Sequence, residues 1–435
     1  MTTTQQVERD GRERLADGTG GAAADGGRPP GFLALLRVAG GRRYALALVV
    51  DALGGGLLRP FLLLYGVSVL GMDAGRVGLA LSVGMLAGLA AIPLTGRWID
   101  HGARSAAGAV ALLTRSAGVA VLLSVDGPVG FALAAALMGI GSQSWPTTHA
   151  AIVATLAEGR TRDAALAAGR SLRNAGLGAG ALLATVAVAQ GTGALRALAV
   201  GTAVASLAAG GLVWSLRVRA AREPKEQRES QEPRTGAGPA PAVRVEGPDG
   251  RRMRVLSAAN LPYAFCFDVL EVALPALLVT YLHASPAWAS GIFVGNTLLV
   301  IGTQVGVVVW LGRRSRRSVL AGSGLLLALS YLGFWAAGAL GGTAGAAALA
   351  GVAVLYTGGE ILYAGSGTAL VVASAPPERL GRALARWELS TGIGRAAAPA
   401  GLTALLVVGP GVLWGVLAGT TALAAVAVRR YAPRV

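Results

Sequence analysis

Residues 76–96 read RVGLALSVGMLAGLAAIPLTG and contain a single charged side chain, at their first position. A helix that crosses the hydrocarbon layer of a bilayer, ~30 Å thick, needs about 20 predominantly apolar residues. This stretch has that length and that composition. It therefore predicts one membrane-spanning helix.

Eleven further stretches of this kind follow from the same criterion. The twelve expected spans are 44–70, 76–96, 105–125, 129–154, 165–189, 196–216, 257–282, 288–311, 318–338, 344–373, 384–408 and 412–430. Only 14% of the residues are charged, whereas a soluble domain carries about 25%. We therefore expect an all-α membrane protein of twelve transmembrane helices, with most of its surface in contact with lipid.

The connections between the spans differ strongly in positive charge. The even-numbered loops and the membrane-proximal tails carry 27 Lys and Arg residues, and the odd-numbered loops carry two, Arg76 and Arg196. Because cytoplasmic loops are enriched in Lys and Arg, both termini and the central loop should lie in the cytoplasm. The net charge of +16 is explained in the same way, so we expect the lipid bilayer as a partner and no nucleic acid.

Polar segments divide the chain into its expected domains. Residues 1–43 should form a disordered cytoplasmic tail, because the first 30 are polar and lack the apolar core of a signal peptide. Residues 217–255 are rich in Pro, Glu, Gln and Arg and should form a cytoplasmic linker. This linker separates an N-terminal six-helix bundle, 44–216, from a C-terminal one, 256–430, which a short tail, 431–435, follows.

The two bundles show signs of an internal repeat. A shift of 216 residues places Tyr65 on Tyr281, Gly96 on Gly312 and Arg170 on Arg386. With a slip of one residue, Asp51 falls on Asp268. Two parallel six-helix repeats related by a pseudo-twofold axis along the membrane normal are the architecture of the major facilitator fold.

Composition excludes several other kinds of site. The single cysteine, Cys266, rules out a disulfide framework and a thiolate zinc cluster. The three histidines are scattered along the chain. We therefore expect no metal site and no cofactor. The chain also lacks the Gly-x-x-x-x-Gly-Lys-Ser/Thr motif of nucleotide-driven pumps.

Charged residues inside the expected spans mark the candidate site, because an unpaired charge in a bilayer is costly. Five acids balance five arginines, with most arginines in the first bundle and most acids in the second. Pairing between the bundles would neutralise them, and breaking and remaking such pairs could switch the protein between two states, open to one side of the membrane or to the other. The ten residues are Asp51, Arg59, Arg115, Arg170, Arg173, Asp268, Glu271, Glu360, Glu388 and Arg395.

Four of the acids are candidates for proton coupling: Asp51, Asp268, Glu271 and Glu360. Asp268 and Glu271 are three residues apart and should be neighbours on one helix face. Two carboxylates so close in a poorly solvated site cannot both ionise easily, so one of them should hold a proton. The alternative is a static salt bridge to Arg59, Arg115 or Arg395.

Polar residues at similar depth are candidates for the substrate cavity. The fourth span contains a polar run around Pro146, which should kink the helix and let Gln143 and His149 face the cavity. In the tenth span, Tyr356, Glu360 and Tyr363 follow at helical spacing. Neighbouring helices could instead satisfy these groups. The full candidate set for the cavity is Arg59, Tyr65, Arg115, Gln143, His149, Tyr356 and Arg395.

The connection between the second and third spans reads Gly96-Arg-Trp-Ile-Asp100-His-Gly-Ala-Arg104. It resembles the signature loop of the major facilitator superfamily, although His101 replaces a usual basic residue. The resemblance implies a cytoplasmic gate, in which the acid caps the N-terminal end of the eleventh helix. The gate residues expected are Gly96, Asp100, Arg104, Arg170, Arg173 and Glu388. The matching loop of the second half, Gly312–Arg317, has lost the acid.

The first span, from Asp51 to Tyr65, is similar to first helices of actinobacterial drug-efflux-like members of that superfamily. Two features depart from this pattern: Ala135 stands where the fourth helix should carry an arginine, and the fifth helix lacks the antiporter Gly-Pro run. Arg115 is a candidate replacement for the missing arginine.

Together these features predict a secondary transporter that alternates access around a midplane cavity. We expect proton-coupled export of a small molecule by a monomer in the cell membrane. Three alternatives stay open: an uptake symporter of the same fold, a polytopic membrane enzyme such as a lipid-modifying transferase, and a receptor-like relative that binds a ligand without moving it.

Overall fold

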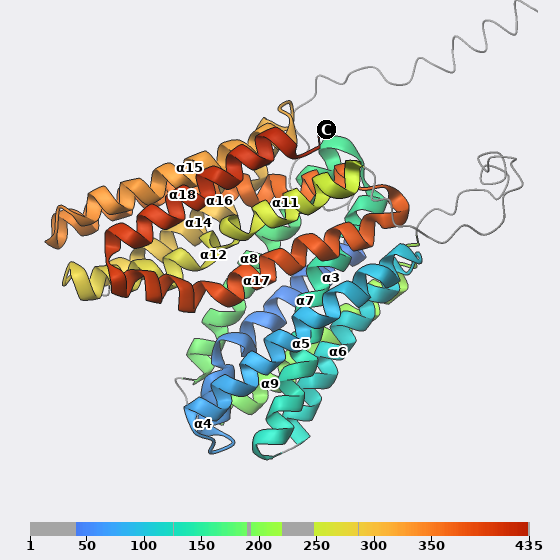
Figure 1. Cartoon of the computed structure of the whole chain (residues 1–435). Helices are drawn as coiled ribbons and strands as arrows, with labels where there is room; N and C mark the ends of the chain where they lie inside the picture. The colour runs from blue at the N-terminus through green and yellow to red at the C-terminus, as the bar shows by residue number, and fades with distance from the viewer. Residues whose placement is uncertain (1–40, 125, 189–192, 220–247, 286, 434–435) are drawn as a thin grey trace, which may run out of the picture.

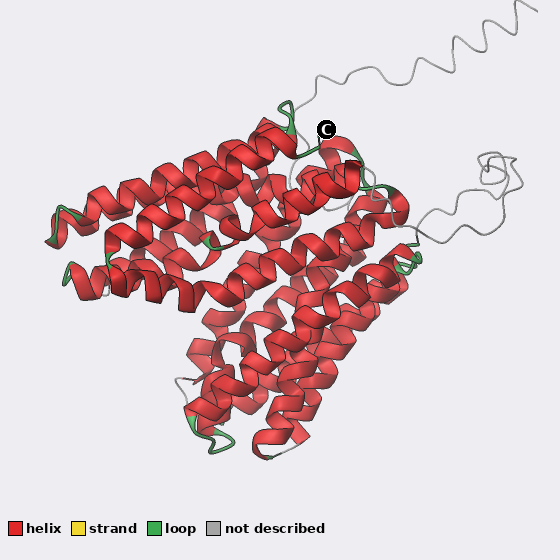
Figure 2. Cartoon of the chain, in the orientation of Figure 1, coloured by secondary structure: helices red, strands yellow, loops and turns green. Residues whose placement is uncertain are grey.

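The computed structural model describes residues 41–124, 126–188, 193–219, 248–285 and 287–433, and this part of the chain consists of helices and connecting loops (Figure 2). The predicted tails up to residue 40 and from residue 434, and the predicted linker from 220 to 247, lie outside the described residues. Six long helical segments precede residue 220 and six follow residue 247.

The first helix of the N-terminal half is interrupted once. A short 3-10 segment at Pro60 separates α3 from α4, because proline cannot donate the helical hydrogen bond. The elements of this half are α3 (Gly41–Leu58), η1 (Arg59–Phe61), α4 (Leu62–Ser68), α5 (Ala74–Asp100), α6 (Arg104–Ser124), α7 (Gly127–Leu156), α8 (Gly159–Val188) and α9 (Ala194–Ser215).

The first helix of the C-terminal half is more irregular, with two π-helical segments, η2 and η3, in its C-terminal part. The elements of this half are α11 (Pro248–Ala264), α12 (Cys266–Asp268), η2 (Val269–Ala273), α13 (Leu274–Ala276), η3 (Leu277–Tyr281), α14 (Ala287–Leu311), α15 (Arg316–Gly338), α16 (Gly342–Ser374), η4 (Pro377–Arg379), α17 (Leu380–Val408) and α18 (Pro410–Tyr431).

The twelve helical segments coincide with the twelve predicted spans to within a few residues at most ends. Two ends differ more: α5 continues past the predicted end at 96 to Asp100, and α8 begins at Gly159 instead of 165. The last part of the predicted linker is also helical, because α11 begins at Pro248. Eleven segments of the described chain are long and apolar enough to cross a membrane by hydropathy. The twelfth, α7, has the required length, and its polar run around Pro146 lowers its hydropathy.

The two halves form separate bundles that converge at one end and diverge at the other (Figure 1). The C-terminal end of α18 lies at the convergent end, as does the start of α3, and we call this end the termini side (Figure 1). Two helix pairs join the halves, because α5 packs on α17 and α8 packs on α14. The pseudo-twofold axis exchanges these two pairs, since each joins the second helix of one half to the fifth helix of the other.

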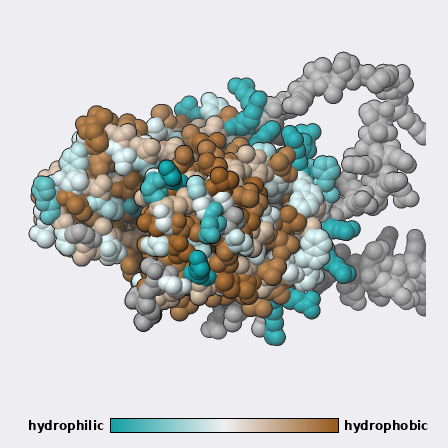
Figure 3. Space-filling view, turned by 90° about the horizontal axis from the view of Figure 1, so that it is seen from below, coloured by the Kyte–Doolittle hydropathy of each residue, from teal (hydrophilic) through white to brown (hydrophobic). Residues whose placement is uncertain are grey.

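The face of the molecule seen in Figure 3 is largely apolar. Hydrophilic side chains gather at one edge of this face, and a few interrupt the apolar surface near its middle (Figure 3). Because lipid tails are as apolar as the helices, tight backbone packing has to hold such bundles together. The α5–α7 contact illustrates this, since a Cβ on Gly84 would lie 2.7 Å from the carbonyl carbon of Ala135.

Candidate functional site

On the termini side, Asp100 closes the contact between α5 and α17. Its Oδ1 accepts a hydrogen bond from the backbone N–H of Gly381 at 2.6 Å, and its Oδ2 lies 2.6 Å from Nε of Arg382. The carboxylate thus faces the positive N-terminal end of α17, where a negative charge is stabilising. Gly96 permits this approach, because a Cβ there would lie 2.6 Å from the carbonyl oxygen of Gly381. We call this set of contacts the Asp100 latch.

A second ion pair joins the halves at the other helix pair. Asp163, in the first turns of α8, lies 2.7 Å from Nε of Arg316, the first residue of α15. Both side chains are largely buried, with 10% and 21% of their side-chain surface exposed. We call this pair the Asp163 latch. The sequence analysis missed it because α8 begins six residues before the expected position 165, which placed Asp163 in a loop.

The other predicted gate residues lie elsewhere. Arg104 is buried in the N-terminal half, where its guanidinium donates a hydrogen bond to the Thr155 hydroxyl. Arg170, Arg173 and Glu388 are deeper than the two latches, and Glu388 interacts electrostatically with both arginines. Among the described residues, the ion pairs within 4 Å that join the two halves are those of the latches, and the deeper charges interact across the halves at longer range.

A group of charged side chains from both halves meets between the bundles, and we call it the central cluster. Arg59 is exposed to solvent, yet its charge interacts with Asp268 and Glu271 of the opposite half. A side chain that is solvent-accessible and close to charges of both bundles lines the space between them. The members of the cluster are Arg59, Arg170, Arg173, Asp268, Glu271, Glu360, Glu388 and Arg395.

Asp268 is only loosely paired. Nε of Arg395 lies 3.6 Å from its Oδ2, too far for a hydrogen bond, and this oxygen has no hydrogen-bond partner among the described residues. Asp268 is 8% exposed, whereas Glu271 is exposed to solvent. The two acids interact electrostatically, as their spacing predicted. Between them the helix changes to the π-helical segment η2, a departure that is frequent at functional sites.

Aromatic side chains connect the cluster across the halves. Arg170 of α8 and Arg395 of α17 lie over the ring of Phe267, with distances of 5.5 and 5.6 Å to its centroid. Phe267 in turn packs against Tyr363, and Arg170, Phe267, Tyr363 and Glu388 line one small hollow. Such cation–π contacts let two arginines approach one ring without a carboxylate between them.

A polar network that the sequence analysis did not identify supports this hollow. The Tyr363 hydroxyl donates to Oδ1 of Asn260 at 2.8 Å, and Nδ2 of Asn260 donates to Ser390 and Thr391 at 2.7 and 2.8 Å. The network links the first, fourth and fifth helices of the C-terminal half. Asn260 carries no charge, so a search for charged residues within apolar spans passes over it.

Two predicted site residues pair with each other inside the N-terminal half. Arg115 forms an ion pair with Asp51 and donates from Nε to the Ser206 hydroxyl at 3.1 Å. Asp51 and Arg115 are 4% and 9% exposed. The structure therefore brings these two residues together inside the N-terminal half, between α3, α6 and α9.

Three further residues expected at the substrate cavity lie within the bundles. Tyr65 is 1% exposed and packs in an apolar cluster with Leu58 and Val77. Tyr356 is fully buried against Tyr331 and Phe334, and its hydroxyl donates to the Cys266 carbonyl.

The third of these residues, His149, stacks on Tyr44, and its Nδ1 lies 2.7 Å from the Tyr44 hydroxyl. Gln143 is placed differently, because its Nε2 would lie 3.7 Å from a Cβ on Gly392 of the other half.

Glu360 belongs to both the cluster and the interior of the C-terminal half. Its Oε2 accepts a hydrogen bond from Nδ2 of Asn296 at 2.8 Å, and the same amide nitrogen donates to the Thr357 hydroxyl at 3.0 Å. Within the described residues, the His, Cys, Asp and Glu side chains form no group of three or more that could hold a metal ion.

Comparisons with known proteins agree with this architecture. Residues 44–260 match the family model described as Major Facilitator Superfamily. No curated protein sequence matches the chain.

Among solved structures, the human organic anion transporter MFSD10 (TETRAN) has a TM-score of 0.67 at 19% identity, over 92% of this chain and 100% of that chain. A bacterial homologue of the iron transporter ferroportin, in an outward-facing state, has a TM-score of 0.68 at 14% identity, over 91% and 99%. The E. coli fucose:proton symporter FucP has a TM-score of 0.63 at 13% identity, over 90% and 98%.

These neighbours span nearly the whole chain, so both halves have the major facilitator fold. The family model covers the N-terminal bundle and extends into the first helix of the second. The chain is thus a multi-pass membrane protein, and its N-terminal half belongs to the major facilitator superfamily. With the same fold completed by the second half, the protein is a membrane transporter, not an enzyme.

Proposed function

We propose that this transporter exports a small molecule from the cytoplasm in exchange for protons, by alternating access between its two halves. The observation that carries the proposal is the central cluster. Incompletely paired acids, among them Asp268, lie beside the exposed Arg59 and Glu271 in the space between the bundles. Charged groups at membrane depth mark substrate and proton pathways, since their burial is otherwise costly.

Both termini lie in the cytoplasm in this proposal, because the positive charges flank the spans on that side. The termini side is the closed one, so the structure corresponds to an outward-open state. The outward-facing ferroportin homologue and FucP in its outward conformation, both similar in fold, support this assignment. Opening the Asp100 and Asp163 latches would then expose the central cluster to the cytoplasm.

Asp268, Glu271 and Glu360 exchange protons in this scheme, and Arg59 and Arg395 are the cations with which they compete. Protonation of Asp268 would release Arg395, and binding of a substrate would displace the proton. Asp51 and Arg115 act structurally, because they satisfy each other inside the N-terminal half. The energy comes from the proton gradient across the cell membrane.

Proteoliposomes test this function directly. Purified protein is reconstituted with an imposed pH gradient, and a panel of small organic ions and neutral compounds is followed in both directions. Gradient-driven flux opposite to the proton flow supports export. Flux in the same direction as protons would identify an uptake symporter instead, and flux that ignores the gradient across the whole panel would reject proton coupling.

A further inference from the structure

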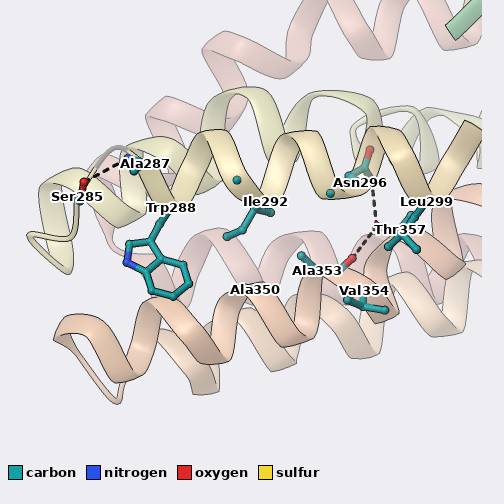
Figure 4. A pocket seen from close by; sticks show the side chains of 12 residues that line it. Ser285, Ala287, Trp288, Ile292, Asn296, Leu299, Ala350, Ala353, Val354 and Thr357 are labelled. Carbon is teal, nitrogen blue, oxygen red and sulfur yellow. Dashed lines mark hydrogen bonds between the residues drawn. The ribbon is translucent and has the colours of Figure 1, made fainter. Parts of the chain in front are cut away.

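A second cavity lies inside the C-terminal half, between α14 and α16 (Figure 4). It has a volume of about 350 Å³, within the range of small-molecule sites. Along α14 the lining residues recur on one helix face from Ala287 to Leu299, and Ala350, Ala353 and Val354 line it from α16. Trp288 lies near one end of this lining and Asn296 near the other (Figure 4).

The lining is apolar over most of its length and polar at its deep end. At that end, Asn296 and Thr357 line the cavity and are joined by a hydrogen bond, drawn as a dashed line in Figure 4. The same Asn296 amide donates to Glu360, which follows Thr357 by less than one helical turn. An anionic group therefore stands directly behind the polar end of an apolar cavity.

Glu360 differs from the other buried acids in the partner that holds it. Asp51 pairs with Arg115, Asp163 with Arg316 and Asp268 with Arg395, whereas the hydrogen-bond donor to Glu360 is the neutral amide of Asn296.

The charges of Arg170, Arg395 and Glu271 also act on Glu360. Arg395 already faces Asp268, and Arg170 lies over Phe267. A carboxylate at membrane depth gains free energy from a cation beside it.

The face of α14 that lines the cavity also carries a polar residue further along the helix, toward its C-terminal end. Gln304 lies two turns further along α14, on the same face as Asn296 and Val300. It is fully buried, and neither atom of its amide group has a hydrogen-bond partner among the described residues. Buried polar groups are normally satisfied, so the unpartnered amide of Gln304 extends the polar character of this helix face beyond the cavity itself.

From this arrangement we infer that the α14–α16 cavity binds the apolar body of an amphipathic cation, whose charged group reaches Asn296 and Glu360. The inference deepens the proposed function, on which it rests, by naming the class of substrate. Such a molecule would lie beside the central cluster, with its charge next to a proton-exchanging acid. Binding of the cation and protonation of Glu360 would then exclude each other.

Two glycines allow the cavity to be filled without disturbing the fold. A Cβ on Gly291 or Gly295 would meet no atom within 4 Å, although both residues line the cavity. Gly295→Leu therefore places a side chain in the empty volume. Gly302 of the same helix is a matched control, because its Cβ position is equally free and it does not line the cavity.

The test is equilibrium binding of tritiated tetraphenylphosphonium to the full-length protein in detergent, measured by scintillation proximity. We expect Gly295→Leu and Glu360→Gln each to weaken binding about tenfold, the latter by removing a charge–charge interaction of about 1.4 kcal/mol. Gly302→Leu should bind as the unchanged protein does. Neutral triphenylphosphine oxide should compete at least about tenfold more weakly than unlabelled cation.

Unchanged affinity in Gly295→Leu, an equal loss in Gly302→Leu, or equal competition by the neutral compound would overturn the inference. The inference would also be overturned if Gly295→Leu lost co-purified phospholipid but still bound the cation, because the cavity would then be a lipid site. Binding needs no gradient, so its result is independent of proton-coupled flux. A transporter that moves other compounds normally but binds no cation here would retain the proposed function and lose only this inference.

Discussion

Asp51 and Asp268 occupy repeat-related positions in the first helices of the two halves, yet their surroundings differ. Asp51 is paired with Arg115, which Ser206 also binds, and all three lie inside one bundle. Asp268 faces Arg395 across 3.6 Å, next to the π-helical segment η2 and the exposed Glu271. The same position is thus neutralised within the N-terminal half and left incompletely compensated in the C-terminal half.

This difference assigns different physical tasks to the two halves. A buried, fully paired carboxylate contributes to folding, because removing either partner leaves an unpaired charge. A carboxylate with one unsatisfied oxygen can change its protonation state at little structural cost. Under the proposed function, we therefore expect the N-terminal half to be the more rigid body and proton exchange to take place mainly in the C-terminal half.

The largest effect should come from breaking the pair in the N-terminal half. Asp51→Ala leaves Arg115 buried without its partner and should lower the free energy of unfolding by about 3–5 kcal/mol. The double variant Asp51→Ala/Arg115→Leu should regain most of that loss, because it removes both charges. Unfolding in detergent micelles measures both values, with Asp126→Ala as an exposed acidic control. Equal stabilities of the single and double variants would show that the pair is not structural.

Asp268→Asn should impair proton coupling and leave stability nearly unchanged, the reverse of the effect expected for Asp51→Ala. Its stability should change little, because Arg395 is partly exposed and retains solvent. In proteoliposomes, the ratio of substrate flux with and without a pH gradient should fall to about one, since the acid no longer binds a proton. Substrate exchange without a gradient should persist. If Asp268→Asn kept its response to the gradient, proton coupling would have to reside on another acid.

The twelve spans and the division into two halves could be predicted from length and composition alone. Each helix must satisfy its backbone inside the bilayer, which leaves long apolar runs as the dominant signal. The Asp100 contact with α17 was expected from the resemblance of its loop, and the structure has this contact.

The orientation of side chains within the bundles could not be predicted in the same way. Tyr65 and Tyr356 were expected at the cavity but pack inside their own halves. A helix that is apolar all round carries no sequence signal for the face that meets each neighbour. Asn260 and Asn296 were missed for a related reason, because a neutral amide is inexpensive enough to occur anywhere in a bundle.

The repeat-related glycines Gly96 and Gly312 extend the comparison to the termini side. A Cβ on Gly96 would lie 2.6 Å from the Gly381 carbonyl oxygen, whereas one on Gly312 would lie 3.4 Å from the flexible end of Arg160. Gly96→Ala should therefore push α5 from α17 and disfavour the closed termini side by about 1–3 kcal/mol. Gly312→Ala should have a much smaller effect on gradient-driven flux. Equal losses in the two variants would contradict this asymmetry.

The smallest effect should come from the two latches themselves, which close equivalent helix pairs by different means. Asp100 faces a helix N-terminus, a backbone N–H and Arg382, whereas Asp163 faces the side chain of Arg316. Asp163→Asn should weaken closure by about 1 kcal/mol, because the side-chain amide can still accept the hydrogen bond from Arg316. Asp100→Asn should weaken it by more, because the charge also loses its stabilisation at the helix end.

A cross-link across α8 and α14 reports this closure. In a Cys266→Ala background, Arg160→Cys/Gly312→Cys brings two thiols together, because a Cβ on Gly312 would lie 3.4 Å from Cδ of Arg160. The yield with a short bifunctional reagent should fall about two- to fivefold on Asp163→Asn. The exchanged pair Asp163→Arg/Arg316→Asp should restore it, because the attraction is then rebuilt with reversed sign. An exchange that restores nothing, beside a single variant that lowers the yield, would mean that Asp163 acts through the end of α8 rather than through Arg316.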